Sequence, residues 1–231
     1  MPESLSPAVG LAVLHLFFRV DNGEGKSVDA SAVSVAVKSC QADDHQVVSF
    51  AVLGHKADVG FMALGADMWR LRRLQSDLVR AGLVLVDSYV SMTEASEYTM
   101  GMPEEMLKAR LYPTLPPNGM RAVCFYPMSK RRGLGEEENW FTLPFDDRNK
   151  LMREHGVSGR KFHGRVTQMV TGSTGLDDFE WAVTLFAHDP ADLKATVYTM
   201  RFDEASAVYA EFGRFLTGMI AEIDELAAEL F

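Results

Sequence analysis

The side chains of this chain that could do redox and ligand chemistry lie mainly between Cys124 and Trp181. An oxidisable phenol, Tyr126, stands shortly before a run of basic residues, and a histidine, His155, stands directly before a glycine. A phenol can lose an electron and a proton, an imidazole can bind a metal ion, and lysine and arginine side chains bind carboxylates. Together these residue types are suited to holding a flat, anionic, redox-active ligand.

Tyr126 fits two interpretations. Pro127 follows it, which favours an extended backbone and places the tyrosine near the end of a strand. A tyrosine in such a place is commonly a core residue whose hydroxyl donates to a carbonyl oxygen. Lys130, four residues later, favours catalysis instead, because its ammonium group could hold an acidic ligand near the phenol.

His155 is expected to end a helix, because Gly156 is typical of the position just after a helix. There the imidazole could cap the helix or bind a metal ion. Neither a cysteine nor a second histidine four residues away accompanies it, which argues against zinc. A single histidine suits haem iron, since the porphyrin supplies the other four donors. His163 is the competing candidate for that role.

Cationic residues with aromatic or apolar neighbours are spread along the chain. Taken one at a time, each fits an unrelated surface charge. If they converge, they would select a ligand with several carboxylates, because guanidinium groups pair with carboxylates through two parallel hydrogen bonds. The residues are Arg110, Lys130, Arg160 and Arg201.

Two neutral polar residues, Gln168 and Ser206, lie on otherwise apolar elements and fit either core hydrogen-bonding groups or donors in a pocket. The Gly-Ser-Thr-Gly turn at residues 172–175 resembles a phosphate-binding loop only superficially. It lies between two expected strands and lacks a following lysine, so we expect no nucleotide site there.

The composition predicts a soluble globular protein of 231 residues, with 47% hydrophobic and 24% charged residues. The net charge of −9 argues against a general nucleic-acid-binding protein and against a basic membrane-binding surface. No apolar run is long enough to span a membrane, and no signal peptide is expected. Cys40 and Cys124 lack zinc or haem-attachment spacing, and we expect them to be buried thiols in a cytoplasmic protein.

The first half of the chain predicts the order β-α-β-β-α-β, which is ferredoxin-like. Strands are expected at residues 11–20, 47–53, 59–64 and 84–90, and helices at residues 28–40 and from residue 64 to a stop at Gly82. Residues 98–117 are expected to connect the two halves, because they contain a Gly-Met-Pro turn and a Pro-Pro pair.

The second half repeats this pattern. Strands are expected at residues 122–126, 165–171, 180–187 and 209–216, helices at residues 145–155 and from Pro190 onward, and a charged loop at residues 131–138. Two such units predict an α+β protein, a dimeric α+β barrel whose two ferredoxin-like repeats close within one subunit. The expected divisions are an N-terminal half at 1–115, a C-terminal half at 116–217, and an amphipathic helix at 218–231. That helix could dock on its own subunit or form an oligomer contact.

Several stretches resemble the chlorite dismutase-like family, and within it the coproheme decarboxylases of the Firmicutes kind. The resemblance is carried by residues 124–132, 154–160, 168, 172–181 and 200–206. It implies a homopentamer of ferredoxin-like repeats with iron coproporphyrin III (coproheme) bound in the C-terminal half. It also implies that hydrogen peroxide drives oxidative decarboxylation of two propionates to give haem b. This is the last step of coproporphyrin-dependent haem biosynthesis, with coproporphyrin ferrochelatase as the donor of the substrate.

Carried over by motif, the resemblance implies that His155 is the proximal iron ligand, Tyr126 the radical oxidant and Lys130 the lysine beside the reacting propionates. It also implies cofactor contacts, in addition to those of Tyr126 and Lys130, for Arg110, Met128, Arg160, Gln168 and Ser206.

Two departures from the family pattern bear on the reaction. Gln168 stands where chlorite-degrading members have a distal arginine, which argues against chlorite dismutation. No histidine lies between His55 and His155, so the distal histidine of some decarboxylases is missing and peroxide activation must use another base or water. The loop at 131–138 and the C-terminal helix look like additions to the pattern. Two alternatives remain: a haem-binding or haem-carrying protein without turnover, and an α+β-barrel monooxygenase for a small organic substrate.

Overall fold

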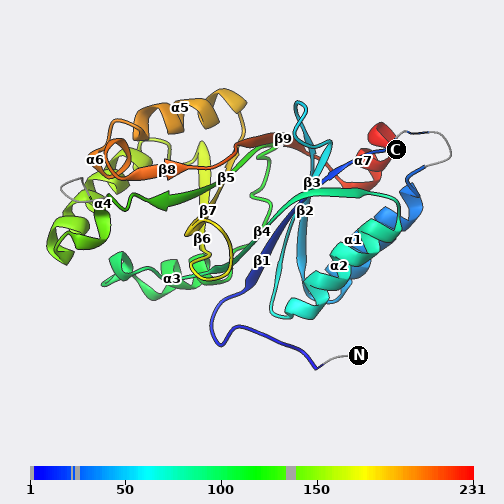
Figure 1. The fold of residues 1–231 in the computed structure, drawn as a ribbon, viewed down its shortest axis with the longest axis horizontal. Helices are drawn as coiled ribbons and strands as arrows, with labels where there is room; N and C mark the ends of the chain where they lie inside the picture. The colour runs from blue at the N-terminus through cyan, green and yellow to red at the C-terminus, as the bar shows by residue number, and fades with distance from the viewer. Residues whose placement is uncertain (1–2, 22, 24–26, 134–138) are drawn as a thin grey trace.

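A computed structural model describes residues 3–21, 23, 27–133 and 139–231 (Figure 1). Both halves have the predicted element order. The first contains β1 (Ala12–Arg19), α1 (Ala30–Ala42), β2 (Gln46–Val52), β3 (Val59–Gly65), α2 (Met68–Arg80) and β4 (Val84–Thr93). The second contains β5 (Ala122–Lys130), α4 (Phe145–Arg160), β6 (Val166–Gly172), β7 (Trp181–Ala187), α5 (Pro190–Met200) and β9 (Leu216–Ile220).

Shorter elements fill the connections: η1 (Glu97–Thr99), α3 (Glu104–Leu111), η2 (Trp140–Thr142), α6 (Glu204–Ala207), β8 (Ala210–Phe212) and α7 (Ile223–Leu230). The connector between the halves therefore contains a helix, α3, that the turn pattern did not predict. Residues 134–138 of the expected charged loop lie outside the described residues.

The nine strands in the described parts of the chain form one antiparallel sheet that closes on itself. Their order is β7-β6-β4-β1-β3-β2-β9-β5-β8, and a further pairing of β5 with β7 completes the ring. The short β8 lies outside this ring and pairs with the end of β5 from Met128 to Lys130. The prediction of a dimeric α+β barrel built from two ferredoxin-like repeats within one subunit is confirmed.

Side chains that alternate along the strands separate the inside of the barrel from its outer face. On β1, Val13 and Phe17 pack in the cluster enclosed by the strands, whereas Leu14 and Phe18 pack against the helices outside. Helices α1 and α2 lie side by side over the outer face of the first half (Figure 1). In the second half, α5 packs on β5 and β7, while α4 makes its main contacts with α5 and α6.

The expected stop at Gly156 is wrong, because α4 continues through this glycine to Arg160. A glycine inside a helix costs only about 1 kcal/mol relative to alanine, which tertiary contacts readily offset. The glycine with a positive φ after this helix is Gly164, at +77°. His155 therefore lies inside the helix and does not cap its end.

The end of the chain also differs from the prediction. The last strand of the barrel is Leu216–Ile220, and the segment at 209–216 supplies only the short β8. Gly218, which was expected to begin the C-terminal helix, lies opposite Val52 in the pairing of β9 with β2. A side chain at this position would collide with the carbonyl oxygen of Ala51, so glycine permits the two strands to approach.

Helix α7 packs on its own subunit. Ile223 is buried in the cluster beneath α1 and α2, and Lys38 of α1 pairs with Asp224 at 2.6 Å. Among the described residues, no helix is both long and apolar enough to cross a membrane.

Candidate functional site

Strand β5 presents one face to the outside of the barrel, where the candidate residues lie. Its alternation places Cys124, Tyr126, Met128 and Lys130 on the same face. Cys124 and Tyr126 pack in a cluster with Leu185 of β7, and Met128 lies at its border. The strand is longer than expected and ends at Lys130, so the phenol and the ammonium group share one rigid element.

Tyr126 is buried in an aromatic environment. Its ring stacks on Phe215 with centroids 4.4 Å apart and meets Phe212 edge-on at 5.7 Å. Burial raises the pKa of the phenol above its usual value. The hydroxyl has no hydrogen-bond partner among the residues that the structure describes, so it is not tied to a carbonyl oxygen as a structural core tyrosine would be.

His155 is paired with a carboxylate that comes from another element. Its Nδ1 atom lies 3.2 Å from Oδ2 of Asp203, just before α6, and 3.5 Å from Oγ of Ser206. The other oxygen of Asp203, Oδ1, accepts a hydrogen bond of 2.7 Å from Ser158, one turn after His155 on α4. The carboxylate is thereby held next to the imidazole.

The surroundings favour a neutral imidazole. Burial lowers the pKa of His155 below its usual value, the positive charge of Lys130 lowers it further, and Asp203 acts in the opposite direction. A neutral imidazole with its Nδ1 proton directed at a carboxylate offers the lone pair of Nε2 to a metal ion.

Lys130 is almost fully buried, with 8% of its surface exposed. Its Nζ atom donates to the carbonyl oxygen of Ala205 at 2.5 Å and lies 4.4 Å from the centre of the Trp140 ring. Burial lowers the pKa of the ammonium group to about 8. Lys130 thus adjoins α6, next to Ser206, and it acts electrostatically on His155.

In the described parts of the chain, none of the three candidate arginines forms a hydrogen bond or ion pair with His155 or Lys130. Arg160 is exposed at the end of α4, and its guanidinium folds back toward Gly156, next to His155. Arg110 is exposed on α3 and has no ion pair with any residue that the structure describes. Arg201 is stacked against the surface rings of Tyr198 and Phe202 rather than directed at His155.

The remaining candidates are separated from this group. Gln168 is exposed on β6, while its neighbour Met169 is buried inside the barrel, so Gln168 faces outward. His163 is exposed in the turn after α4 and, in the part of the chain that the structure describes, forms no hydrogen bond or ion pair with Asp203 or Lys130. The structure therefore brings together His155, Ser206 and Lys130, and places Tyr126 and Met128 on the strand that carries Lys130.

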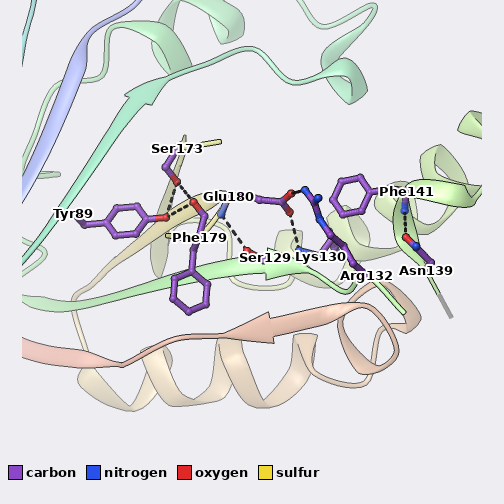
Figure 2. A network of polar contacts seen from close by, with 9 residues as sticks. All are labelled: Tyr89, Ser129, Lys130, Arg132, Asn139, Phe141, Ser173, Phe179 and Glu180. Atoms are coloured by element: carbon purple, nitrogen blue, oxygen red, sulfur yellow. Dashed lines mark hydrogen bonds and ion pairs between the residues drawn. The ribbon is translucent and has the colours of Figure 1, made fainter. Parts of the chain in front are cut away.

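Three residues of the site had no role assigned to them from the sequence. Asp203 pairs with His155, Trp140 lies under Lys130, and Glu180 accepts a hydrogen bond from the backbone N–H of Lys130. Figure 2 shows Glu180 between Lys130 and Arg132. The local sequence does not reveal these contacts. Asp203 and Glu180 act through partners 48 and 50 positions away, and Trp140 meets Lys130 from ten positions further along the chain.

Two surface hollows lie away from this group. One, of about 320 Å³, lies between α1 and α2, and the other, of about 280 Å³, lies beside Gln46 and Leu115. No candidate residue lines either hollow. The candidate site is therefore defined by the contacts among His155, Asp203, Ser206 and Lys130.

These side chains fit an iron porphyrin. Asp203 Oδ2 is buried without a hydrogen-bond partner among the described residues, and Nδ1 of His155 lies 3.2 Å from it. No group of three or more histidine, cysteine or acidic side chains that could hold a metal ion occurs in the described parts of the chain. One imidazole can bind an iron atom whose other donors arrive with it, as in a porphyrin.

A comparison with family models decides the family. The model described as chlorite dismutase matches residues 27–221. The chain belongs to the chlorite dismutase family. This match also extends over most of the first half, where the sequence motifs are weaker.

Relatives within the family are similar over nearly their whole length. A coproheme decarboxylase of Staphylococcus carnosus (strain TM300) is 38% identical, with 95% of each chain covered. The structure of a haem-binding protein from Thermus thermophilus has a TM-score of 0.84 at 35% identity and covers 99% of both chains. A mutant chlorite dismutase of Candidatus Nitrospira defluvii has a TM-score of 0.79 at 19% identity, with 97% of both chains covered, and shares the fold.

Proposed function

We propose that this protein is a coproheme decarboxylase, which uses hydrogen peroxide to convert iron coproporphyrin III into haem b. One observation carries the proposal: a single neutral imidazole, His155, is held by Asp203 beside a buried lysine, Lys130, that extends from the strand of Tyr126. The similarity to the coproheme decarboxylase of Staphylococcus carnosus supports the same substrate.

The electron balance of the reaction sets what the protein must do. Each propionate side chain loses carbon dioxide, one proton and two electrons as it becomes a vinyl group. One hydrogen peroxide takes up two electrons and two protons and gives two waters. When bound, the iron porphyrin supplies the redox chemistry that joins these two half-reactions.

His155 would hold the iron through Nε2, with Asp203 fixing the tautomer and the direction of the ring. Lys130, Arg160, Arg110 and Ser206 would bind the propionates, and Met128 and Gln168 would contact the macrocycle. Lys130 starts from a buried place, so binding a propionate would stabilise its charged form. Convergent cations are required because the ligand carries four carboxylates.

Tyr126 would relay the oxidising equivalent to the propionate. Its raised pKa keeps the phenol protonated, so it would lose an electron together with its proton. The resulting radical could then take a hydrogen atom from the propionate β-carbon. Loss of carbon dioxide would release the second electron to the bound iron porphyrin. The rings of Phe212 and Phe215 pack against Tyr126, which is 7% exposed to solvent.

The broader assignments belong to the same proposal. Coproheme would bind in the half at 116–217, and the half at 1–115 would carry no haem. The protein would act in the cytoplasm as a homopentamer, receive its substrate from coproporphyrin ferrochelatase, and bind neither nucleic acid nor membrane.

Mass spectrometry of the bound porphyrin before and after peroxide tests the function. The enzyme should convert the four-propionate ligand into three-propionate and then two-propionate products. A haem-carrying protein would bind the ligand and leave its propionates intact, and a monooxygenase for a small organic substrate would give no Soret band with coproheme. Either result would overturn the proposal.

A further inference from the structure

The turn between β6 and β7 ends in a buried carboxylate that contacts the end of β5. Glu180 is 8% exposed. Its Oε1 accepts a hydrogen bond of 2.8 Å from Nη2 of Arg132, and its Oε2 accepts one of 3.1 Å from the backbone N–H of Lys130. Its own backbone N–H donates to Oγ of Ser129 at 3.1 Å (Figure 2). Glu180 thus contacts the last two residues of β5, Ser129 and Lys130, and also Arg132 just beyond the strand.

The carboxylate extends the sheet beyond the end of β7. The pairing of β5 with β7 stops at Met128 opposite Trp181, so no residue of β7 remains to pair with Lys130. Glu180 Oε2 accepts the backbone N–H of Lys130 in that place, while Ala210 of β8 pairs with Lys130 on the other side. The backbone of Lys130, and with it the direction of its side chain, is therefore fixed from both sides.

The ion pair between Glu180 and Arg132 also helps to position Trp140, the aromatic residue against which the Lys130 side chain packs. The Arg132 guanidinium lies 4.6 Å from the centre of the Phe141 ring. The backbone N–H of Trp140 donates to the carbonyl oxygen of Arg131 at 3.1 Å. These contacts hold Trp140 beside the end of β5, where its ring lies under the Lys130 ammonium group.

The turn that carries Glu180 is anchored to the other half of the barrel. The hydroxyl of Tyr89, on β4, lies 2.6 Å from Oγ of Ser173 and donates to the carbonyl oxygen of Phe179 at 2.9 Å. The backbone N–H of Ser173 donates to the carbonyl oxygen of Glu180 at 2.8 Å. The Gly-Ser-Thr-Gly turn is thus a support for Glu180. Figure 2 shows the polar contacts from Tyr89 to Arg132, with the Phe141 ring near the Arg132 guanidinium.

The ion pair between Glu180 and Arg132 contributes little to stability, because the Arg132 side chain is 68% exposed and solvent screens its attraction to the carboxylate. Its value here is geometric. We propose that Glu180 is a positioning residue, which holds the Lys130 ammonium group over Trp140 and against Ala205 so that it can receive a ligand carboxylate. The identity of the ligand carboxylate depends on the proposed function. The position of Lys130 does not, because Glu180 holds it in the protein without ligand.

The test uses Trp140 as a reporter of the Lys130 charge. In a Trp69→Phe, Trp181→Phe background Trp140 is the single tryptophan, and its fluorescence is measured without ligand from pH 7 to pH 9.5. The background protein should show a transition near pH 8 that Lys130→Met removes. Adding Glu180→Gln should reduce its amplitude and raise its midpoint by about one pH unit, because a released ammonium group returns toward its ordinary pKa of about 10.4.

Glu211→Gln is the matched control. Glu211 lies on β8 opposite Ser129 and pairs with Arg131 at 3.7 Å, but it is exposed and does not contact the backbone of Lys130. The fluorescence transition of the Glu211→Gln variant should match that of the background protein. If the Glu180→Gln and Glu211→Gln transitions coincide, the positioning role is wrong.

A second variant keeps the test decisive if Glu180→Gln does not fold. Arg132→Gln keeps the Glu180 carboxylate next to Lys130 but removes the ion pair of Glu180 and the contact with Phe141. The midpoint of the fluorescence transition should therefore also rise. An unchanged transition would overturn the proposal.

Binding of metal-free coproporphyrin III, followed by porphyrin fluorescence, links the position of Lys130 to the ligand. Glu180→Gln should weaken it about threefold to tenfold and Glu211→Gln should leave it unchanged. Failure of the parent protein to bind the porphyrin would refute the proposed function without altering the fluorescence result.

Discussion

The Nδ1 atom of His155 lies 3.2 Å from Oδ2 of Asp203, an oxygen with no hydrogen-bond donor among the described residues. Asp203 is itself held by Ser158 through its other oxygen, at 2.7 Å. A carboxylate beside one ring nitrogen of a histidine selects the tautomer with the proton on that nitrogen. In the proposed function, the pair would leave the lone pair of Nε2 of His155 directed at the iron.

Asp203→Asn should weaken coproheme binding by about tenfold, because the imidazole loses the partner that orients it. Asp203 raises the pKa of His155, so its removal should also make the imidazole a weaker base. The iron–imidazole stretching frequency of the reduced complex should fall accordingly. Asp146→Asn, an exposed change in the first turn of the same helix, serves as the control. Equal frequencies in the two variants would contradict the role of Asp203.

His155→Ala should leave a folded protein with weakened coproheme binding and a changed iron spin state. His163→Ala, in the exposed turn after α4, should bind like the parent. Absorption and electron paramagnetic resonance spectra of both complexes decide between the two histidines. Loss of the imidazole signature in His163→Ala alone would show that the assignment of His155 is wrong.

Lys130→Met should change how stability depends on pH. The pKa of Lys130 is lowered to about 8 in the folded protein, against about 10.4 in an unfolded chain. Between these values the unfolded state binds more protons, so the contribution of Lys130 to stability rises with pH. The unfolding free energy of the parent, relative to that of the variant, should increase by up to about 3 kcal/mol from pH 7 to pH 10.

Urea titrations at several pH values measure this difference. Lys150→Met, an exposed change on α4, should give a curve parallel to that of the parent. Taking differences between proteins cancels the opposing contributions of Cys40 and Cys124, whose pKa values burial raises. Parallel curves for Lys130→Met and the parent would mean that Lys130 is not buried as a charged group.

Tyr126→Phe should bind coproheme and react with peroxide, yet leave all four propionates intact. Phenylalanine keeps the contacts with Phe212 and Phe215 but has no acidic hydrogen to lose. Since the hydroxyl has no hydrogen-bond partner among the described residues, the unfolding free energy should fall by less than about 1 kcal/mol. Tyr198→Phe, at an exposed tyrosine of α5, is the control. Mass analysis that finds three- or two-propionate products from Tyr126→Phe at parental rates would rule out the radical role.

The sequence alone predicted the order of elements and the barrel class, because both depend on local periodicity. Alternating side chains on β1 and apolar residues at helical spacing on α2 identify each element without knowledge of its neighbours. The residue types and motifs also predicted functional roles for Tyr126, Lys130 and His155, and these roles stay predictions. The errors occurred where packing outweighs local preference: at Gly156, which the helix retains, and at Gly218, which β9 needs to approach β2.

The partners of these residues were decided by the tertiary structure. Asp203 follows His155 by 48 positions and Glu180 follows Lys130 by 50 positions, so no periodicity relates them. They meet because α4 packs against α6 and because β7 pairs with β5 up to Trp181. A hydrogen bond needs its two atoms within about 3 Å, and only the packing of distant elements sets separations to that accuracy.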